Sequence, residues 1–273
     1  MIDLVIKIGS MALINKDYND INYNIFARLS RELRPGYALV SSGATEIGRL
    51  DFIKRNGTEL AENGDYEKAK TDYAAQGQSV LMQNYRQFVD SKYSLRQILV
   101  EHQHFNDADK REHLKEMLLR CSVQNAIPII NYNDAVSEEE NRKMEIQARR
   151  SIGQKVVECV DNDETAAQVA CLLNCKTLLI LTSTDGIYKN AADSSTIVKE
   201  VKSSDPNELL VKVCELQKSC VGANRRGAFG ALAKLEYIKE PLRQGIKVII
   251  SNSAFKIEDI LSGVARSTVF EVK

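Results

Sequence analysis

Short apolar runs alternate along the chain with segments of helical periodicity. The runs have the length of strands and lie near Leu4, Leu39, Ile98, Ile129, Leu179 and Val248. In the segments between them apolar residues recur three or four positions apart, as they do from Tyr73 to Phe88 and from Leu114 to Cys121. This alternation predicts an α/β protein with a mainly parallel sheet and helices on both of its faces.

Two polar stretches interrupt the pattern. Residues 56–70 contain Gly57 and Gly64 and few large apolar side chains, and residues 137–154 are charged, so both are expected to be surface excursions. No internal repeat, low-complexity tract or proline-rich linker divides the chain. We therefore expect residues 1–273 to form one compact unit in which two lobes share one continuous sheet.

The charge of the chain gives no reason to expect a nucleic acid or a membrane as a partner. Its 37 basic and 37 acidic side chains cancel. The longest apolar stretches, residues 177–181 and 246–250, have the length of a strand, and the N-terminus lacks the regions of a secretion signal. We therefore expect a cytoplasmic protein that acts on a small molecule.

The cysteines and histidines do not have the spacing of a metal site. No two cysteines form a C-x-x-C pair, so we expect all of them to pack as small reduced hydrophobic side chains. The three histidines have no partner at the spacing of zinc ligands and are expected to be solvated. These residues are Cys121, Cys159, Cys171, Cys175, Cys214 and Cys220, and His102, His104 and His113.

A lysine lies inside the first apolar run, which continues from Ile2 through Lys7 into Gly9 and Ser10. Burying an ammonium group is costly unless it meets a negative partner. The run fits a parallel core strand that delivers Lys7 to a ligand crevice at the edge of the sheet. It also fits an edge strand whose lysine extends into solvent, and this segment alone does not decide between the two.

The second apolar run ends in small residues that precede a helix. Ser42, Gly43 and Ala44 would expose backbone N–H groups and a hydroxyl at the helix N-terminus, where a carboxylate or phosphate is stabilised. A tight strand-to-helix connection explains the same residues without a ligand.

Two polar clusters follow the fourth apolar run. Residues 131–134 (Asn-Tyr-Asn-Asp) come at the end of a strand, and residues 161–163 (Asp-Asn-Asp) come at the start of a helix. Helix capping by Asn162 or Asp163 accounts for the second cluster but not for both. Together they place carboxylate and carboxamide groups on one side of the sheet, where they can hold an α-amino group or orient cationic groups.

Two further segments have features of a nucleotide site. The apolar run 177–181 opens into Thr182-Ser183-Thr184-Asp185-Gly186-Ile187-Tyr188, a turn that can lie along a nucleotide. Residues 222–235 form a basic loop with spaced glycines that leads into a helix containing Lys234, a composition suited to phosphoryl transfer. Since neither GxxxxGK[ST] nor an N-terminal GxGxxG occurs, a P-loop enzyme and a dinucleotide-binding site are not indicated.

Six segments in this order resemble the amino acid kinase family, and within it the enzymes that phosphorylate the side-chain carboxylate of glutamate. Each segment alone is a weak motif, but the order covers nearly the whole chain. The segments are residues 5–10 (VIKIGS), 40–48 (VSSGATEIG), 74–85 (AAQGQSVLMQNY), 128–136 (PIINYNDAV), 161–163 (DND) and 181–188 (LTSTDGIY).

The resemblance implies an αβα sandwich of the amino acid kinase or carbamate kinase type. It implies that residues 1–170 bind the amino acid and that residues 171–273 bind ATP with Mg²⁺. The implied activity is transfer of phosphate from ATP to the side-chain carboxylate of L-glutamate, giving L-glutamyl 5-phosphate in the first step of proline synthesis. A homo-oligomer, either a dimer or a tetramer, and feedback inhibition by proline are implied as well, whereas the RNA-binding-like domain appended to many members is not expected.

The resemblance also implies roles for individual residues, none of them a metal ligand. The catalytic residues would be Lys7, Lys234 and Asp163. The amino acid would be bound by Ser42, Gly43, Asn131, Asp134, Asp161 and Asn162. ATP would be bound by Lys7, Gly9, Ser10, Thr182, Ser183, Asp185, Tyr188, Gly227, Gly230 and Lys234.

Several departures from the family pattern leave alternatives open. Tyr132, Val160 and Ser183 replace a glutamate, a glycine and an aspartate of the family, and the stretch from Val136 to Asp161 is longer than expected. These changes allow another acceptor, such as aspartate, acetylglutamate, carbamate or a nucleotide monophosphate. The loop 227–234 keeps two glycines and the lysine of its family counterpart but loses its other residues, which allows a non-catalytic ligand-binding or regulatory relative.

Overall fold

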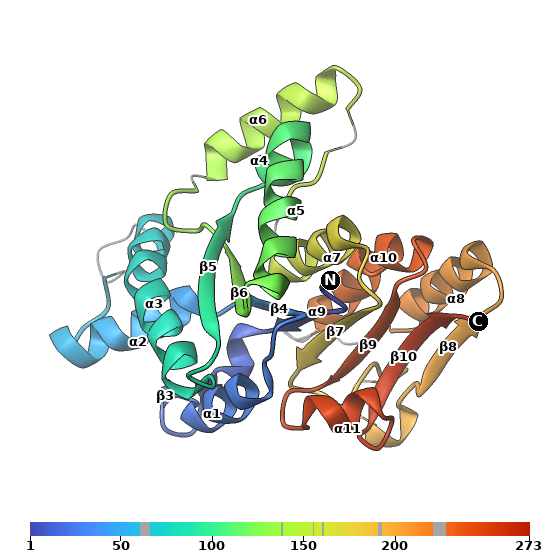
Figure 1. The fold of residues 1–273 in the computed structure, drawn as a ribbon, viewed down its shortest axis with the longest axis horizontal. Helices are drawn as coiled ribbons and strands as arrows, with labels where there is room; N and C mark the ends of the chain where they lie inside the picture. The colour runs from blue at the N-terminus through green and yellow to red at the C-terminus, as the bar shows by residue number, and fades with distance from the viewer. Residues whose placement is uncertain (61–65, 138, 155, 160, 191–192, 221–227) are drawn as a thin grey trace.

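A computed structural model describes the chain from residue 1 to 273 except residues 61–65, 138, 155, 160, 191–192 and 221–227. Eight strands of the described residues form one sheet in the order β5-β6-β4-β1-β7-β9-β10-β8 (Figure 1). The six strands from β5 to β9 in this order are all parallel to one another, whereas β10 is antiparallel to β9 and parallel to β8. The strands are β1 Leu4–Ile8, β4 Tyr37–Ser41, β5 Ser94–Val100, β6 Ala126–Tyr132, β7 Thr177–Thr182, β8 Glu200–Ser203, β9 Lys247–Asn252 and β10 Ser267–Val272, and a separate hairpin joins β2 Ile14–Asn15 to β3 Asp20–Ile21.

Helices pack on both faces of the sheet, so the expected α/β sandwich with a mainly parallel sheet is confirmed. One face is covered by α1 Tyr23–Glu32, α2 Ala44–Asn56, α3 Tyr66–Phe88 and α11 Ile257–Leu261. The other is covered by α5 Ala108–Val123, α7 Asn162–Leu173, α8 Pro206–Ser219, α9 Ala228–Tyr237 and α10 Lys239–Arg243. The remaining helices are η1 Ser10–Ala12, α4 Gln103–Asn106, α6 Glu139–Ser151 and η3 Ser194–Thr196.

The central strand β1 shows how the sequence sets the two faces. Successive side chains of a strand point to opposite faces, so Ile6 and Ile8 pack against the layer of α1, α2 and α3, while Val5 packs against the layer of α7. By the same alternation Lys7 lies on the α7 face. Although it is a lysine, it is only 6% exposed. It therefore lies inside the core and not at a solvated edge of the sheet.

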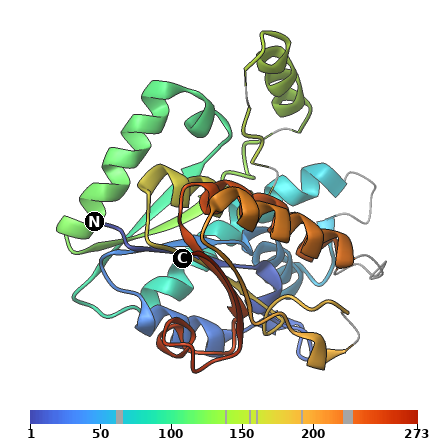
Figure 2. The ribbon, with the colours of Figure 1, turned by 90° about the vertical axis from the view of Figure 1, so that its right-hand side faces the viewer.

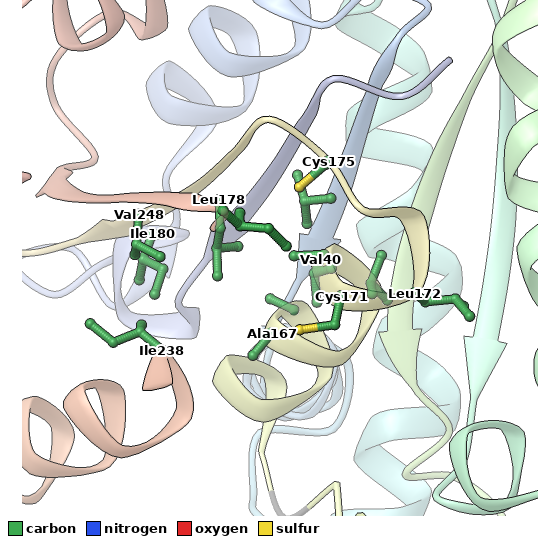
Figure 3. Packing of buried hydrophobic residues seen from close by; sticks show 14 of the residues in the cluster. Val40, Ala167, Cys171, Leu172, Cys175, Leu178, Ile180, Ile238 and Val248 are labelled. Atoms are coloured by element: carbon green, nitrogen blue, oxygen red, sulfur yellow. The ribbon is translucent and has the colours of Figure 1, made fainter. Parts of the chain in front are cut away.

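The layer under α7 is a tightly packed apolar region. Ala167 and Cys171 of α7 lie beside Val40 of β4 and Leu178 of β7, strands on either side of β1 (Figure 3). Truncating a buried residue such as Leu178 to alanine would cost about 2–5 kcal/mol of folding free energy, because a cavity would remain. This packing fixes the height of α7 above β1, and with it the position of the first turn of α7.

The polar stretch 137–154 differs from its prediction. Residues 139–151 form the helix α6, because the segment is rich in Glu, Lys, Arg, Gln and Ala, which favour a helix. The helix projects away from the sheet in both views (Figures 1 and 2), and it contacts the body through Ile146, which is buried, and through Glu145. Of the other polar stretch, residues 56–60 and 66–70 are described, and the latter belong to α3.

The expectation that the histidines are solvated is wrong for His102. Its side chain is buried, and its Nε2 lies 2.8 Å from Oε2 of Glu145 on α6. The contact depends on α6, a helix that the sequence pattern did not predict.

The cysteines match their prediction. All six are free, and Cys121, Cys159, Cys171 and Cys175 are buried. Burial raises the pKa of the Cys175 thiol to about 11, so this thiol stays protonated at neutral pH. Across the described residues, each helix is either too short or too polar to cross a bilayer.

Candidate active site

Two lysines from distant parts of the chain meet one carboxylate. Nζ of Lys7 on β1 lies 2.7 Å from Oδ1 of Asp163, and Nζ of Lys234 on α9 lies 2.9 Å from Oδ2 of the same residue. The side chains of Lys7 and Asp163 are 8% and 6% exposed, and that of Lys234 is 16% exposed. The structure thus brings together all three residues that were predicted to be catalytic.

Local structure places Asp163 at the N-terminus of α7. Oδ1 of Asp161 accepts hydrogen bonds from the backbone N–H groups of Asp163 and Glu164, so Asp161 is the N-cap of the helix. A carboxylate in the first helical turn is stabilised by the helix dipole. The capping interpretation was therefore correct in kind, but the cap is Asp161 and not Asn162 or Asp163.

The charges of the three residues stabilise one another. Burial alone would raise the pKa of Asp163, but the ammonium groups of Lys7 and Lys234 outweigh burial and lower it below its usual value. Asp163 is therefore ionised at neutral pH. One carboxylate between two ammonium groups leaves an excess positive charge, which is suited to an anionic ligand.

Other predicted site residues lie in the loops next to Lys7. A Cβ atom added to Gly9 would lie 3.7 Å from Nζ of Lys7, and one added to Gly43 would lie 3.7 Å from Cα of Ser10. Gly43 is the N-cap of α2 with a φ of 106°, a left-handed conformation that favours glycine. The backbone N–H of Ser42 donates to the carbonyl of Ile8, which holds this turn against the end of β1.

A chain of three side-chain amides crosses the end of the sheet. Nδ2 of Asn162 donates to Oδ1 of Asn131 at 2.9 Å, and Nδ2 of Asn131 donates to Oε1 of Gln78 at 2.9 Å. The chain runs from α7 on one face, through β6, to α3 on the other. Two predicted substrate residues, Asn131 and Asn162, are thus in direct contact, and Asn162 directly precedes Asp163 in the sequence.

Gln78 also borders a small cavity together with Tyr132, Asn133 and Asp134. Burial raises the pKa of Asp134 to about 6, although the positive charges of Arg142 and Lys70 oppose the shift. An anion that is poorly hydrated in this way gains from a cationic partner. The cavity is therefore suited to an ammonium group next to Asp134.

The predicted nucleotide turn lies at the ends of β7 and β9. Thr182 is the last residue of β7, and Asp185 accepts a 2.9 Å hydrogen bond from Nδ2 of Asn252 at the end of β9. Tyr188 forms an isolated bridge with Ile197, and Ser183 is exposed. The turn is therefore anchored to the sheet on the same edge as the lysine pair.

The glycine loop that precedes Lys234 is only partly described. The carbonyl of Gly230 accepts a 3.3 Å hydrogen bond from Nζ of Lys234, within one helical turn of α9. Gly227 lies outside the described residues, and so does Val160, which replaces a glycine of the family.

A larger cavity lies away from these residues. It has a volume of about 700 Å³ and is lined by segments 194–199 and 263–269. It contains none of the predicted catalytic residues, but its Arg266 lies 3.6 Å from Asp185 of the nucleotide turn.

Three residues at the site were not predicted from the sequence. Gln78 was part of a segment that resembles the family, but nothing in the spacing pointed to its amide. Arg142, whose guanidinium carbon lies 5.8 Å from the ring centre of Tyr132, comes from the unexpected helix α6. Asn252 ends a predicted strand, and the polar residue after an apolar run was the indication that could have identified it.

Comparison with known proteins identifies the family of the chain. Residues 4–252 match the model of the amino acid kinase family. The chain is 31% identical to the glutamate 5-kinase of Alkaliphilus metalliredigens, over 98% of this chain and 95% of that protein. It is 28% identical to the glutamate 5-kinase of Caldanaerobacter subterraneus, of which it covers 64%, and 30% identical to delta-1-pyrroline-5-carboxylate synthase A of Arabidopsis thaliana, of which it covers 31%.

Solved structures share the fold at low identity. Carbamate kinase from Giardia superposes with a TM-score of 0.60 at 15% identity, covering 99% of each chain. The UMP kinase of Ureaplasma parvum superposes with a TM-score of 0.56 at 13% identity, covering 98% of each chain. With the family model matched over most of its length and a relative of 31% identity over nearly its whole length, this chain belongs to the amino acid kinase family.

Proposed function

We propose that this protein transfers the γ-phosphoryl group of ATP to the side-chain carboxylate of L-glutamate, giving L-glutamyl 5-phosphate, the first step of proline synthesis. The observation that carries the proposal is the buried contact of Lys7 and Lys234 with Asp163. The relatives named glutamate 5-kinase support glutamate as the acceptor.

The two substrates are assigned to different parts of the chain. Residues 1–170 bind the amino acid in this proposal, supported by the amide chain and the cavity next to Asp134. Residues 171–273 bind ATP, supported by the turn at Asp185 and by Lys234. Lys7 and Asp163 lie where the two parts meet.

The chemistry needs alignment and charge neutralisation and no general base. A glutamate side chain is already an anion at neutral pH, so its oxygen attacks the γ-phosphorus while the bond from that phosphorus to the bridging oxygen of ADP breaks. Lys7 and Lys234 neutralise the oxygens of the transferred group, and Asp163 holds both ammonium groups in place. Each preorganised cation is expected to lower the barrier by roughly 3 kcal/mol.

Magnesium fits this site as a companion of the ATP phosphates. Both carboxylate oxygens of Asp163 face lysines, and the described residues contain no group of three side chains that would cage a metal. Mg²⁺ commonly binds through substrate phosphates and water, where it neutralises phosphate charge.

An acceptor screen tests the proposed function. The protein is incubated with ATP, Mg²⁺ and one of glutamate, aspartate, acetylglutamate, carbamate or UMP, while ADP is measured and acyl phosphates are trapped with hydroxylamine. Hydroxamate and ADP should form with glutamate. ADP formation with another acceptor and not with glutamate, or ATP binding without turnover on any acceptor, would reject the proposal.

A different acceptor is the second candidate function. Tyr132 replaces the glutamate of the family motif, and the ring of Tyr132 lies near Arg142 of α6 at the edge of the small cavity. These residues change the charge and shape next to Asp134. The same screen identifies that acceptor directly.

The family resemblance further supports a cytoplasmic homo-oligomer, a dimer or a tetramer, that is inhibited by proline. Light scattering after size exclusion measures the oligomeric state. Addition of proline to the glutamate assay measures the inhibition.

A further inference from the structure

Gln78 has a buried amide group without a partner. Its side chain is 8% exposed, and within the described part of the chain Nε2 has no hydrogen-bond acceptor. A buried donor left unpaired is costly, so such groups are rare unless a water molecule or a ligand satisfies them. Gln78 borders the small cavity, which has a volume of about 10 Å³, so the group of a ligand that pairs with Nε2 has to be small, such as one carboxylate oxygen.

The orientation of this amide is fixed by its neighbours. The backbone N–H of Tyr132 donates to Asn131 at 2.9 Å, so the side-chain atom of Asn131 that accepts must be its oxygen. The other terminal atom of Asn131 is then its NH₂ group, and it can only donate to the oxygen of Gln78. The NH₂ group of Gln78 is therefore the one without a partner, and a flipped amide would set two donors against each other.

The cavity combines this donor with an anion. Asp134 supplies a carboxylate, and Gln78 supplies a neutral N–H donor, in a lining that is otherwise mostly apolar. A carboxylate pairs with an ammonium group, and an amide N–H pairs with a carboxylate oxygen. The two groups together match the zwitterionic end of an α-amino acid.

We propose that Gln78 binds the α-carboxylate of the amino-acid substrate, while Asp134 binds its α-ammonium group. This inference rests on the proposed function and names a specificity-determining residue for it. The alternative partner, the side-chain carboxylate, has to reach the two lysines. Asn162 directly precedes Asp163, which contacts the lysines, and Asn131 lies between Asn162 and Gln78 in the amide chain. Gln78 is therefore at the end of this chain that is farther from the lysines.

Gln78→Glu separates ligand binding from a structural role. The carboxylate side chain of this variant keeps the oxygen that accepts the hydrogen bond from Asn131 but has a second acceptor in place of the N–H donor. At pH 8 we expect KM for glutamate to rise roughly tenfold to hundredfold, while KM for ATP changes less than about threefold. The control is Gln83→Glu, which adds the same charge at an exposed position of the same helix and should leave both KM values unchanged.

A substrate analogue tests which carboxylate is bound. L-Isoglutamine has a carboxamide in place of the α-carboxylate and keeps the side-chain carboxylate that accepts phosphate. The wild-type protein should prefer glutamate, and Gln78→Glu should lower the ratio of kcat/KM for glutamate to that for isoglutamine by roughly tenfold or more, because an amide can donate to the new carboxylate. This ratio is measured within one variant, so partial misfolding does not alter it.

The outcomes distinguish the two proposals. If wild-type protein phosphorylates glutamate and both Gln78→Glu and the apolar Gln78→Met leave KM for glutamate unchanged, the assignment of Gln78 is wrong. If Gln78→Glu lowers kcat/KM equally for both substrates, Gln78 supports Asn131 and does not bind the α-carboxylate. If wild-type protein forms no hydroxamate with glutamate, the proposed function fails before Gln78 is tested.

Discussion

Lys7 and Lys234 can each be removed without leaving a buried charge unpaired, because Asp163 keeps the other lysine. Lys7→Ala and Lys234→Ala should therefore fold and lose roughly a hundredfold or more in kcat, as expected for loss of a preorganised cation. Circular dichroism checks the fold, and the hydroxamate assay measures kcat. Lys176→Ala is the control, since Lys176 is exposed and precedes the opposite end of β7. Full turnover in Lys7→Ala would remove the basis of the proposed mechanism.

The raised pKa of Asp134 predicts a pH dependence of substrate binding. Its ordinary value is near 4, and burial raises it to about 6, so the carboxylate takes up a proton as the pH falls through 6. Since only the ionised form pairs with the substrate ammonium group, kcat/KM for glutamate should fall about tenfold from pH 7.5 to pH 5, with KM for ATP nearly constant.

The same shift has the opposite effect on stability. A carboxyl group whose pKa is higher in the folded than in the unfolded state destabilises the fold at a pH above both values, and this cost disappears below both. Asp134→Asn should thus abolish the fall of kcat/KM below pH 6 while raising the unfolding free energy by about 1–3 kcal/mol at pH 7.5 and by nearly nothing at pH 3. A variant that is less stable at pH 7.5 would contradict this account.

At the level of residues, the sequence predicted which groups meet but not how they are oriented. The family resemblance named Lys7, Lys234 and Asp163 as the catalytic residues, although Lys234 lies outside the six matched segments. The amide of Gln78 could not be predicted, because its orientation follows from a backbone N–H of Tyr132 and from contacts among three separate elements. Such contacts have no fixed spacing along the chain.

Among the elements, α2 and α3 contact each other so closely that no side chain fits between their backbones at Gly77. A Cβ atom added to Gly77 would lie 1.8 Å from the carbonyl oxygen of Ala44. Gly77→Ala should push apart the helices that carry Gly43 and Gln78 and cost about 2–3 kcal/mol, which lowers the melting temperature by roughly 5–10 °C. Thermal unfolding measures this loss, and Ala75→Ser at an exposed position of α3 should change the melting temperature little. An unchanged melting temperature in Gly77→Ala would show that the helices can separate freely.

The elements that were predicted correctly are those with a strong period of their own. β1, β4, β5, β6, β7 and β9 coincide with the predicted apolar runs, and α3 and α5 have apolar stripes. β8 and β10 were missed because only one face of each is buried and their apolar residues alternate with polar ones over a few positions. α6 was missed because charged residues without an apolar stripe fit a loop and an exposed helix equally well.

For the whole molecule, the continuous sheet predicts a single unfolding unit. β1 pairs with β4 on one side and with β7 on the other, and one apolar core contains residues of both halves, such as Val40 and Leu178. Calorimetry should therefore show one transition. Glutamate or ATP at a hundred times its own Kd should each stabilise that same transition by about 2.7 kcal/mol. Two transitions that respond separately to the two ligands would mean that the halves fold independently.

The architecture as a class followed from the alternation of strands and helices, whereas the strand order did not. Neighbours such as β1 and β7 are separated by more than half of the chain, and their pairing depends on which surfaces complete one core. The reversal of β10 likewise depends on its place beside β9.

The shared carboxylate of Asp163 has a consequence for how the protein should be handled. Two ammonium groups around one carboxylate attract small oxyanions whenever no nucleotide is present. Sulfate should then act as a competitive inhibitor against ATP and not against glutamate, beyond the effect of sodium chloride at equal ionic strength. Inhibition by the two salts to the same extent would argue against such binding. A phosphate buffer would accordingly occupy the resting protein and make its affinity for ATP look weaker than it is.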